Sequence, residues 1–262
     1  VLHHVHGPMW DQMLPGPLGP LGRFVETRVA PPFYRRGLTI TGAESSREEL
    51  IEIGFRPERV VAVPYGVHAR FRPGGERTSH PSVVAVGRLA PVKRFDRVIR
   101  AVIEARRTVP DLTLTIVGRG PLYDDLRRQI DSVGADAFVR LAGRIDDDEL
   151  IGQYRSSWLV VSGSIAEGWG LSLTEGAGCG TPALATDIRG HRNSVLDGET
   201  GVLVEPDRLG AALAELLTDR SRLDRLAAGA RRWGASLSWE RSVLGLTAGL
   251  HAEVLRSQRA AN

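Results

Sequence analysis

The chain has 262 residues, of which 42% are hydrophobic and 25% charged, a composition typical of globular proteins that excludes a disordered chain. It contains no run of about 18 apolar residues, so we expect no membrane-spanning helix. The net charge is only +3, and the basic residues are interleaved with acidic ones, which argues against a nucleic-acid-binding surface. The single cysteine, Cys179, excludes an internal disulfide and fits a reducing cytoplasm.

Short β-branched and apolar segments alternate with helical patterns along most of the chain. The Gly- and Pro-rich segment 7–22 interrupts this pattern and is predicted to be irregular. Segments such as Val83–Val86 and Leu112–Val117 show little apolar–polar alternation, which is typical of strands covered on both faces. We therefore predict an α/β fold with parallel sheets and helices on both sides. Strands are expected at residues 1–6, 38–42, 59–63, 82–87, 112–117, 137–142, 157–162, 182–186 and 200–204.

Segment 64–81 is rich in Pro, Gly and polar residues and is predicted to be a linker between domains. Residues 1–72 would then form a partial N-terminal domain with the linker, and residues 73–235 a larger C-terminal domain. Residues 236–262 are expected to form a helix that returns towards the N-terminal domain. Only three strands are expected before the linker, too few for a doubly wound sheet, so this part is expected either to pair with another element or to lack its beginning.

In open α/β sheets ligands bind where strands end and helices begin, so these loops are the candidate site. The loop after strand 82–87 carries Arg88 and Lys93, the latter being the only lysine of the chain. Two cations beside Gly87 suit a diphosphate, because charge-assisted hydrogen bonds contribute about 1.5–3 kcal/mol each. The alternative interpretation is a solvated basic loop.

The loop after strand 112–117 reads Gly118-Arg119-Gly120-Pro121. Two glycines before a helix permit either a tight turn or a close approach to phosphate, and the sequence leaves both open. The third glycine of a dinucleotide fingerprint is missing, since Tyr123 occupies its position. The loop therefore argues against an NAD site.

The loop after strand 157–162 places Glu167 and Glu175 eight residues apart, across a glycine-rich turn and a helix start. Backbone amides near Gly170 would face an anion with the positive end of the helix dipole. Glu175 could accept hydrogen bonds from ribose hydroxyls and Glu167 from a sugar ring. The alternatives are a capping box starting at Ser172 for Glu175 and a plain surface acid for Glu167.

Histidines cluster at the start of the chain, where His6 ends the first expected strand beside Gly7. The strand period of two places His4 and His6 on one face. No carboxylate or cysteine at ligand spacing accompanies them, so a metal site is not expected. His6 is either a group in a cleft or a merely packed or exposed histidine.

Five segments of the sequence are GRLAPVK (87–93), GRGP (118–121), EGWGLSLTE (167–175), AGCGTPALATD (177–187) and DGETGVLV (197–204). In this order and spacing they resemble family-4 retaining glycosyltransferases, the glycosyl transferases group 1 with the GT-B fold. The resemblance implies a Rossmann-like parallel-sheet C-terminal domain and an incomplete N-terminal Rossmann-like domain. It also implies transfer of a hexose-type sugar from a nucleotide-diphosphate donor to a hydroxyl, with retention and without a metal ion.

The same resemblance implies the site residues. Arg88 and Lys93 would hold the donor diphosphate, and Arg144 would lie near the nucleobase. His6 would reach the donor sugar from an N-domain strand. The implied catalytic residues are His6, Glu167, Arg88 and Lys93, and the implied donor-binding residues are Arg88, Lys93, Gly118, Arg144, Glu167, Gly168, Trp169, Gly170, Leu171 and Glu175.

By the same resemblance, the donor is a UDP- or GDP-sugar, no cofactor is needed, and the acceptor is a lipid, a saccharide or a small molecule. The protein would be cytoplasmic and could contact a membrane surface. The sequence departs from the family at Pro64-Tyr65-Gly66-Val67-His68 and at Ala43. By the same resemblance, we expect the chain to be a truncated form without the first part of the N-terminal domain.

Two other functions stay open. One is a catalytically incompetent nucleotide-binding remnant, or one subunit of a split glycosyltransferase. The other is a GT-B relative such as an epimerase or a phosphorylase. A pyridoxal-dependent phosphorylase would need a Schiff-base lysine, and only Lys93 is available.

Overall fold

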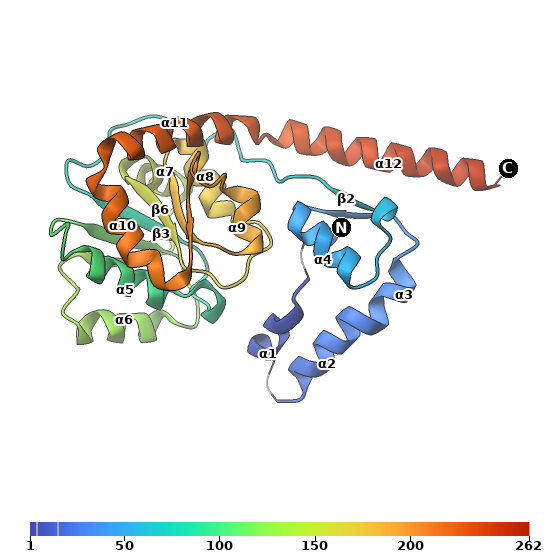
Figure 1. Ribbon diagram of the computed structural model, residues 1–262, viewed down its shortest axis with the longest axis horizontal. Coiled ribbons are helices and arrows are strands. Elements are labelled where there is room, and N and C mark those ends of the chain that lie inside the picture. Colours follow the sequence, from blue (N-terminus) through green and yellow to red (C-terminus); the bar gives the residue numbers. More distant parts are fainter. Residues whose placement is uncertain (4, 15, 262) are drawn as a thin grey trace. The chain divides into compact units, whose positions relative to one another are not determined.

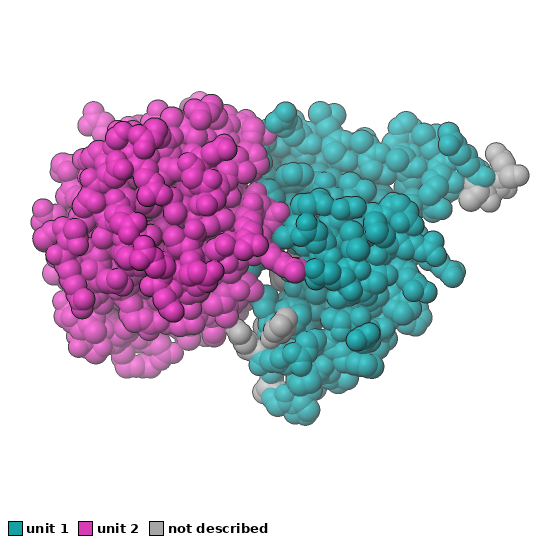
Figure 2. Space-filling model, viewed as in Figure 1, with its two compact units in different colours: residues 1–66, 167–169, 237–262 teal, residues 67–166, 170–236 magenta. Residues whose placement is uncertain are grey.

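The computed structural model describes residues 1–3, 5–14 and 16–261, which form two compact units (Figure 2). Unit 1 contains residues 1–66, residues 167–169 and the chain from Leu237 onward. Unit 2 contains Val67–Ala166 and Gly170–Ser236.

Unit 2 is built on a six-stranded parallel sheet with the order β5-β4-β3-β6-β7-β8 (Figure 1). Its strands are β3 (Ser82–Val86), β4 (Thr113–Val117), β5 (Val139–Gly143), β6 (Leu159–Ser162), β7 (Ala183–Thr186) and β8 (Gly201–Val204). Its α-helices are α5 (Phe95–Ala105), α6 (Tyr123–Ser132), α7 (Asp147–Ser156), α8 (Leu171–Cys179), α9 (Arg189–Ser194), α10 (Leu209–Thr218) and α11 (Arg220–Ser236), with short 3-10 turns at Pro91–Lys93 and Pro206–Arg208.

Helices cover both faces of this sheet, as the weak apolar–polar alternation of its strands predicts. Val83 and Ala85 of β3 point into a core shared with α5 and α10, whereas Val84 points into a second core with Tyr154 of α7 and Leu173 of α8. Successive strand residues face opposite sides, so a strand buried on both sides must be apolar throughout. The strands expected from residue 38 onward are all present, with ends shifted by at most two residues.

Unit 1 contains a two-stranded parallel sheet, in which Thr39 of β1 (Thr39–Thr41) pairs with Val60 of β2 (Val60–Ala62). The crossover between them runs through α4 (Glu44–Glu52) and a 3-10 turn at Pro57–Arg59. Leu50, Phe55 and Val60 form its core. The other helical segments are a 3-10 turn at Gly7–Met9, α1 (Trp10–Met13), α2 (Leu18–Phe24), a π-helical turn at Val25–Val29, α3 (Ala30–Tyr34) and α12 (Trp239–Ala261).

Helix α12 is anchored to the rest of unit 1 at two points. Ser242 Oγ donates to the Pro64 carbonyl at 2.6 Å, and Arg59 forms an ion pair of 2.7 Å with Glu253. Gly66 lies so close to the start of α12 that a Cβ there would be 2.4 Å from the Trp239 nitrogen. Among the described helices, α12 included, none is both long and apolar enough to cross a membrane.

Two expectations for the start of the chain are wrong. Segment 1–6 forms no strand among its described residues, and only Leu2 donates a backbone hydrogen bond to Ile40, at 2.9 Å. Segment 7–22 is largely helical. Gly19 and Gly22 serve helix packing, because a Cβ at Gly19 would be 2.8 Å from Asp11 Cα and one at Gly22 would be 2.9 Å from the Trp10 ring.

Candidate functional site

The candidate site of unit 2 is the edge where its parallel strands end. Strands β3, β4 and β5 follow one another towards one end of the sheet, and β6, β7 and β8 follow one another towards the other end. Neighbouring strands β3 and β6 therefore send their loops in opposite directions, which is the place where open α/β sheets bind ligands. The loops that follow them carry Arg88, Lys93 and Gly170.

The loop after β3 presents two cations. Arg88 is exposed, and Lys93 is half-buried at the end of a 3-10 turn. The Lys93 chain passes beside Gly87, since a Cβ on that glycine would be 3.7 Å from Lys93 Cε. The next residue, Arg94, is the N-cap of α5 and donates two hydrogen bonds of 2.9 Å to Asp96. Arg94 therefore already has an anionic partner within the fold.

Asp96 is held as a carboxylate by its neighbours. Partial burial raises its pKa, but the hydrogen bonds and positive charges of Arg94 and Arg100 outweigh burial and bring the pKa to about 2. This ion-pair group fixes the first turn of α5, directly after Lys93.

Close backbone packing joins the loop after β3 to the loop after β4. A Cβ at Gly118 would be 1.8 Å from the Gly87 carbonyl oxygen, and one at Gly120 would be 2.4 Å from the Leu89 oxygen. The Leu89 amide also donates a hydrogen bond of 2.9 Å to the Arg119 carbonyl of the neighbouring loop. The structure thus gives both glycines a role in letting two loops touch.

The loop after β5 is attached to the same group. Gly118 donates a backbone hydrogen bond of 2.7 Å to the Gly143 carbonyl, and Gly143 adopts a positive φ of 67°. Arg144 follows directly and is exposed. On the other side, Ile165 of the β6 loop donates to the Val92 carbonyl at 3.0 Å. The four loops therefore form one hydrogen-bonded edge.

Helix α8 begins at this edge without a side-chain cap. Its N-cap is Gly170, with a φ of 94°, and Leu171 is its first residue. The first amides of a helix have no acceptor within the helix and carry the positive end of its dipole, which suits an anion. Since Ser172 lies inside the helix, the capping-box alternative for Glu175 is wrong.

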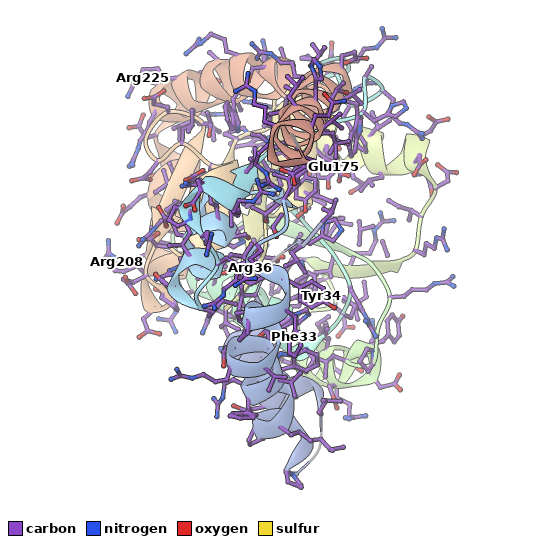
Figure 3. The ribbon with its side chains drawn as sticks, turned by 90° about the vertical axis from the view of Figure 1, so that its right-hand side faces the viewer. Phe33, Tyr34, Arg36, Glu175, Arg208 and Arg225 are labelled. Carbon is purple, nitrogen blue, oxygen red and sulfur yellow. The ribbon has the colours of Figure 1, made fainter. Side chains whose placement is uncertain are left out.

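Glu175 lies one turn further along α8 and is labelled in Figure 3. Its Oε2 accepts a hydrogen bond of 2.8 Å from the hydroxyl of Tyr154, a completely buried residue of α7. Burial raises the pKa of Glu175, and the hydrogen bond from Tyr154 opposes that rise. Burial also raises the pKa of Tyr154 well above its usual value, so this phenol is a permanent donor.

Sequence reasoning missed Tyr154. It lies 21 residues before Glu175 on a different helix, and no motif or spacing connects the two. The only sequence signal is that a tyrosine on a buried helix face needs a partner for its hydroxyl.

The remaining candidate residues belong to unit 1. Glu167 and Gly168 are half-buried, and Trp169 is buried with its ring edge against Tyr65, at a centroid distance of 5.8 Å. The structure therefore divides the expected site residues. Arg88, Lys93, Gly118, Arg144, Gly170, Leu171 and Glu175 lie in unit 2, whereas His6, Glu167, Gly168 and Trp169 lie in unit 1.

His6 precedes the turn at Gly7–Met9 and does not end a strand. Its ring packs on Trp10 at a centroid distance of 4.9 Å, and its Nδ1 lies 3.4 Å from Glu26 Oε1. The expected face partner, His4, lies outside the described residues. Among the described residues, no group of three or more His, Cys, Asp or Glu side chains could hold a metal ion.

Comparisons with known proteins identify the family of the chain. The family model of glycosyl transferases group 1 matches residues 69–233. The D-inositol 3-phosphate glycosyltransferase of Rhodococcus jostii (strain RHA1) is 32% identical over 229 residues, which cover 80% of this chain and 51% of that protein. A GDP-mannose-dependent alpha-(1-6)-phosphatidylinositol monomannoside mannosyltransferase of Mycolicibacterium smegmatis is 32% identical over 182 residues, or 66% of this chain and 47% of that one.

Solved structures share the fold. Anabaena HepE in complex with UDP and glucose aligns with a TM-score of 0.75 and 20% identity, covering 97% of this chain and 71% of that one. S. aureus TarM aligns with a TM-score of 0.78 and 20% identity, covering 95% of this chain and 49% of that one. The chain spans about half the length of the curated relatives that it matches. On its sequence motifs, parallel sheet and family match, this chain is a member of the glycosyl transferases group 1, which are glycosyltransferases of the GT-B type.

Proposed function

We propose that this chain binds a nucleotide-diphosphate sugar and takes part in transferring its hexose to a hydroxyl acceptor, with retention and without a metal ion. The observation that carries the proposal is the joined edge of unit 2, where Arg88, Lys93 and the first amides of α8 follow adjacent strands. Relatives support a UDP- or GDP-sugar, because HepE is solved with UDP and glucose and the mycobacterial relative is GDP-mannose-dependent.

In this proposal the residues of unit 2 stabilise the leaving group. When the bond between the sugar and the diphosphate breaks, negative charge collects on the phosphate oxygens. Arg88, Lys93 and the helix dipole are preorganised to stabilise that charge. Glu175, oriented by Tyr154, accepts hydrogen bonds from the ribose hydroxyls, and Arg144 contacts the nucleobase.

The departing phosphate oxygen takes the proton of the acceptor hydroxyl on the same face of the sugar. A protein nucleophile is then unnecessary, unlike in a retaining glycosidase with two carboxylates beside the bond. For Glu167, Gly168, Trp169, Gly118, Leu171 and His6 we keep the roles that the family resemblance implies, which are contacts with the donor.

Calorimetry with UDP-glucose, UDP-N-acetylglucosamine and GDP-mannose tests the donor, with and without EDTA. We expect saturable binding of at least one of them that EDTA leaves unchanged. Mixing that donor with glycerol, inositol phosphate or a lipid acceptor then tests transfer, and the anomeric configuration of the product tests retention. Binding without acceptor-dependent transfer would favour the binding remnant or split-enzyme alternative, and no binding would contradict the proposal.

We further propose that the acceptor side contacts a membrane surface through α2 and α3. Leu21, Phe24 and Phe33 are 54%, 56% and 78% exposed, and Figure 3 labels Phe33, Tyr34 and Arg36 on this segment. Exposed arginines accompany them at positions 23, 28, 35 and 36. Apolar side chains among cations favour an anionic lipid surface.

Cosedimentation with phosphatidylglycerol and phosphatidylcholine vesicles tests this contact. Binding should occur with the anionic vesicles and should fall about fivefold in Phe33→Ser, because less apolar area enters the interface. Tyr123→Ser, a change at an exposed aromatic residue of unit 2, serves as the control. Equal binding by both variants, or to both vesicle types, would count against the surface.

A further inference from the structure

We propose that His191 is a positioning residue that holds the N-terminus of α8, and with it the amides that meet the diphosphate, in place. The inference rests on the proposed function. His191 lies on α9 and is completely buried, although it belongs to none of the motifs that bind the donor. Burying an imidazole is unfavourable unless its polar atoms are hydrogen-bonded.

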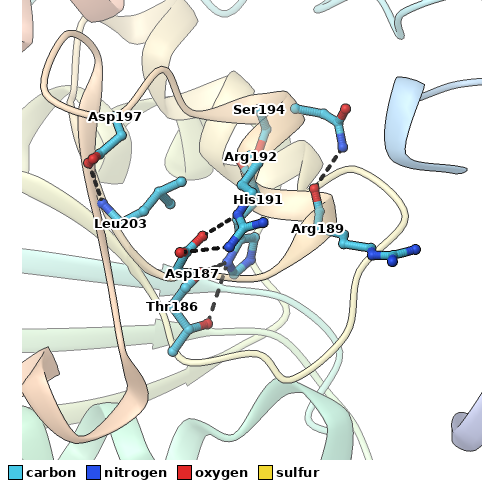
Figure 4. Close-up of polar contacts among 9 residues, drawn as sticks. Thr186, Asp187, Arg189, His191, Arg192, Ser194, Asp197 and Leu203 are labelled. Carbon is cyan, nitrogen blue, oxygen red and sulfur yellow. Dashed lines mark hydrogen bonds and ion pairs between the residues drawn. The ribbon is translucent and has the colours of Figure 1, made fainter. Parts of the chain in front are cut away.

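Both ring nitrogens of His191 bond to strand ends, as the close-up in Figure 4 shows for the Thr186 side. Nδ1 lies 2.7 Å from the carbonyl oxygen of Thr186, the last residue of β7. A carbonyl can only accept, so Nδ1 carries the proton. Nε2 lies 3.2 Å from Ser162 Oγ, at the end of β6, and in the neutral imidazole it accepts from that hydroxyl. The imidazole therefore ties the carboxyl ends of β6 and β7 together.

A second set of hydrogen bonds fixes the loop that leads to α8. Thr186 Oγ1 donates to the Ser164 carbonyl at 2.6 Å, and Ser164 Oγ lies 3.2 Å from Ser162 Oγ. Helix α9 itself is attached to the end of β7, because Arg192 binds Asp187 through two bonds of 2.6 and 2.9 Å (Figure 4). These hydrogen bonds therefore hold α9, which carries His191, at the end of β7.

The same imidazole packs against the N-cap of α8. A Cβ at Gly170 would be 3.3 Å from His191 Cδ2 and 3.0 Å from Ser194 Oγ. Gly170 also needs its φ of 94° to start the helix. His191 and Ser194 therefore set where this glycine lies, and the direction of the next amides follows from it. Donors that are held in position before the ligand binds need no reorganisation on binding.

The test compares nucleoside diphosphates with the nucleosides that lack the diphosphate. Calorimetry with UDP and GDP, and with uridine and guanosine, gives dissociation constants for His191→Asn. Asparagine can keep the donor to Thr186 but cannot reach Ser162. We expect the dissociation constant of the preferred nucleoside diphosphate to rise about tenfold, with less than a twofold change for the nucleoside. His80→Asn, at an exposed position of unit 2, is the matched control and should bind both like the original chain.

Three results would overturn the inference: equal weakening for both ligands, unchanged diphosphate affinity in a folded variant, or a control that behaves like His191→Asn. If His191→Asn does not fold, Ser162→Ala removes only the hydroxyl that faces Nε2, and the same selective loss is expected. If the original chain binds neither UDP nor GDP, the proposed function itself fails. Binding by the original chain that is unchanged in the variants refutes only the role of His191.

Discussion

The Lys93→Ala variant is expected to bind a nucleoside diphosphate about 30-fold more weakly than the original chain, with unchanged affinity for the nucleoside. A hydrogen bond to a charged group contributes about 1.5–3 kcal/mol, and about 1.4 kcal/mol corresponds to a tenfold change in affinity. Lys93 follows β3 at the point where the strand order reverses, and its chain passes beside Gly87. Calorimetry of Lys93→Ala with the nucleoside diphosphate and with the nucleoside measures the two dissociation constants that test this prediction.

Arg225→Ala is the control for Lys93→Ala. Arg225 is exposed on α11, and its side chain bonds to Ser221 of the same helix. Both variants remove one positive charge, so a loss that arises from the net charge alone would appear in both. An equal loss of nucleoside and nucleoside diphosphate affinity in Lys93→Ala would contradict the diphosphate assignment.

Glu175→Gln is expected to weaken binding of the nucleotide donor about tenfold, because a neutral amide oxygen is a poorer acceptor for ribose hydroxyls than a carboxylate. The fold should not suffer. Burial raises the pKa of Glu175 in the folded state. Its stabilising contribution is therefore present below the unfolded pKa and is lost as the pH rises through the folded pKa.

At pH 7 the buried carboxylate of Glu175 therefore lowers the free energy of unfolding, whereas an uncharged glutamine does not. The melting temperature of Glu175→Gln should equal or exceed that of the original chain at pH 7, and the two should converge as the pH falls. Tyr154 can still donate to the amide oxygen. A large drop in melting temperature would mean that the carboxylate mainly supports the helix, and unchanged donor affinity would contradict its ribose role.

Much of unit 2 could be predicted from local patterns. Strand 82–87 was expected from its apolar run and is found as Ser82–Val86, with Arg88 and Lys93 in the loop that follows. The loops at the carboxyl ends of parallel strands lie at one edge of the sheet. The order of elements alone therefore predicts that the loop with Arg88 and Lys93 lies at the same edge as the loops after the neighbouring strands.

The start of the chain was predicted less well, because glycine and proline occur both in turns and in tightly packed helices. In segment 7–22 they indicate turns when only backbone freedom is considered. Gly19 and Gly22 instead let α2 pack tightly against Asp11 and Trp10. That role depends on a neighbouring helix, which no local pattern reveals.

The sequence by itself determined the α/β class, the strands from residue 38 onward and the charged and glycine-rich loops that follow them, because periodicity and backbone freedom are properties of neighbouring residues. Only the tertiary structure decided that Tyr154 binds Glu175 and that His191 joins β6 to β7 beneath Gly170. Those partners lie on separate elements, and burial forces their polar atoms to find one another only after the helices have packed on the sheet.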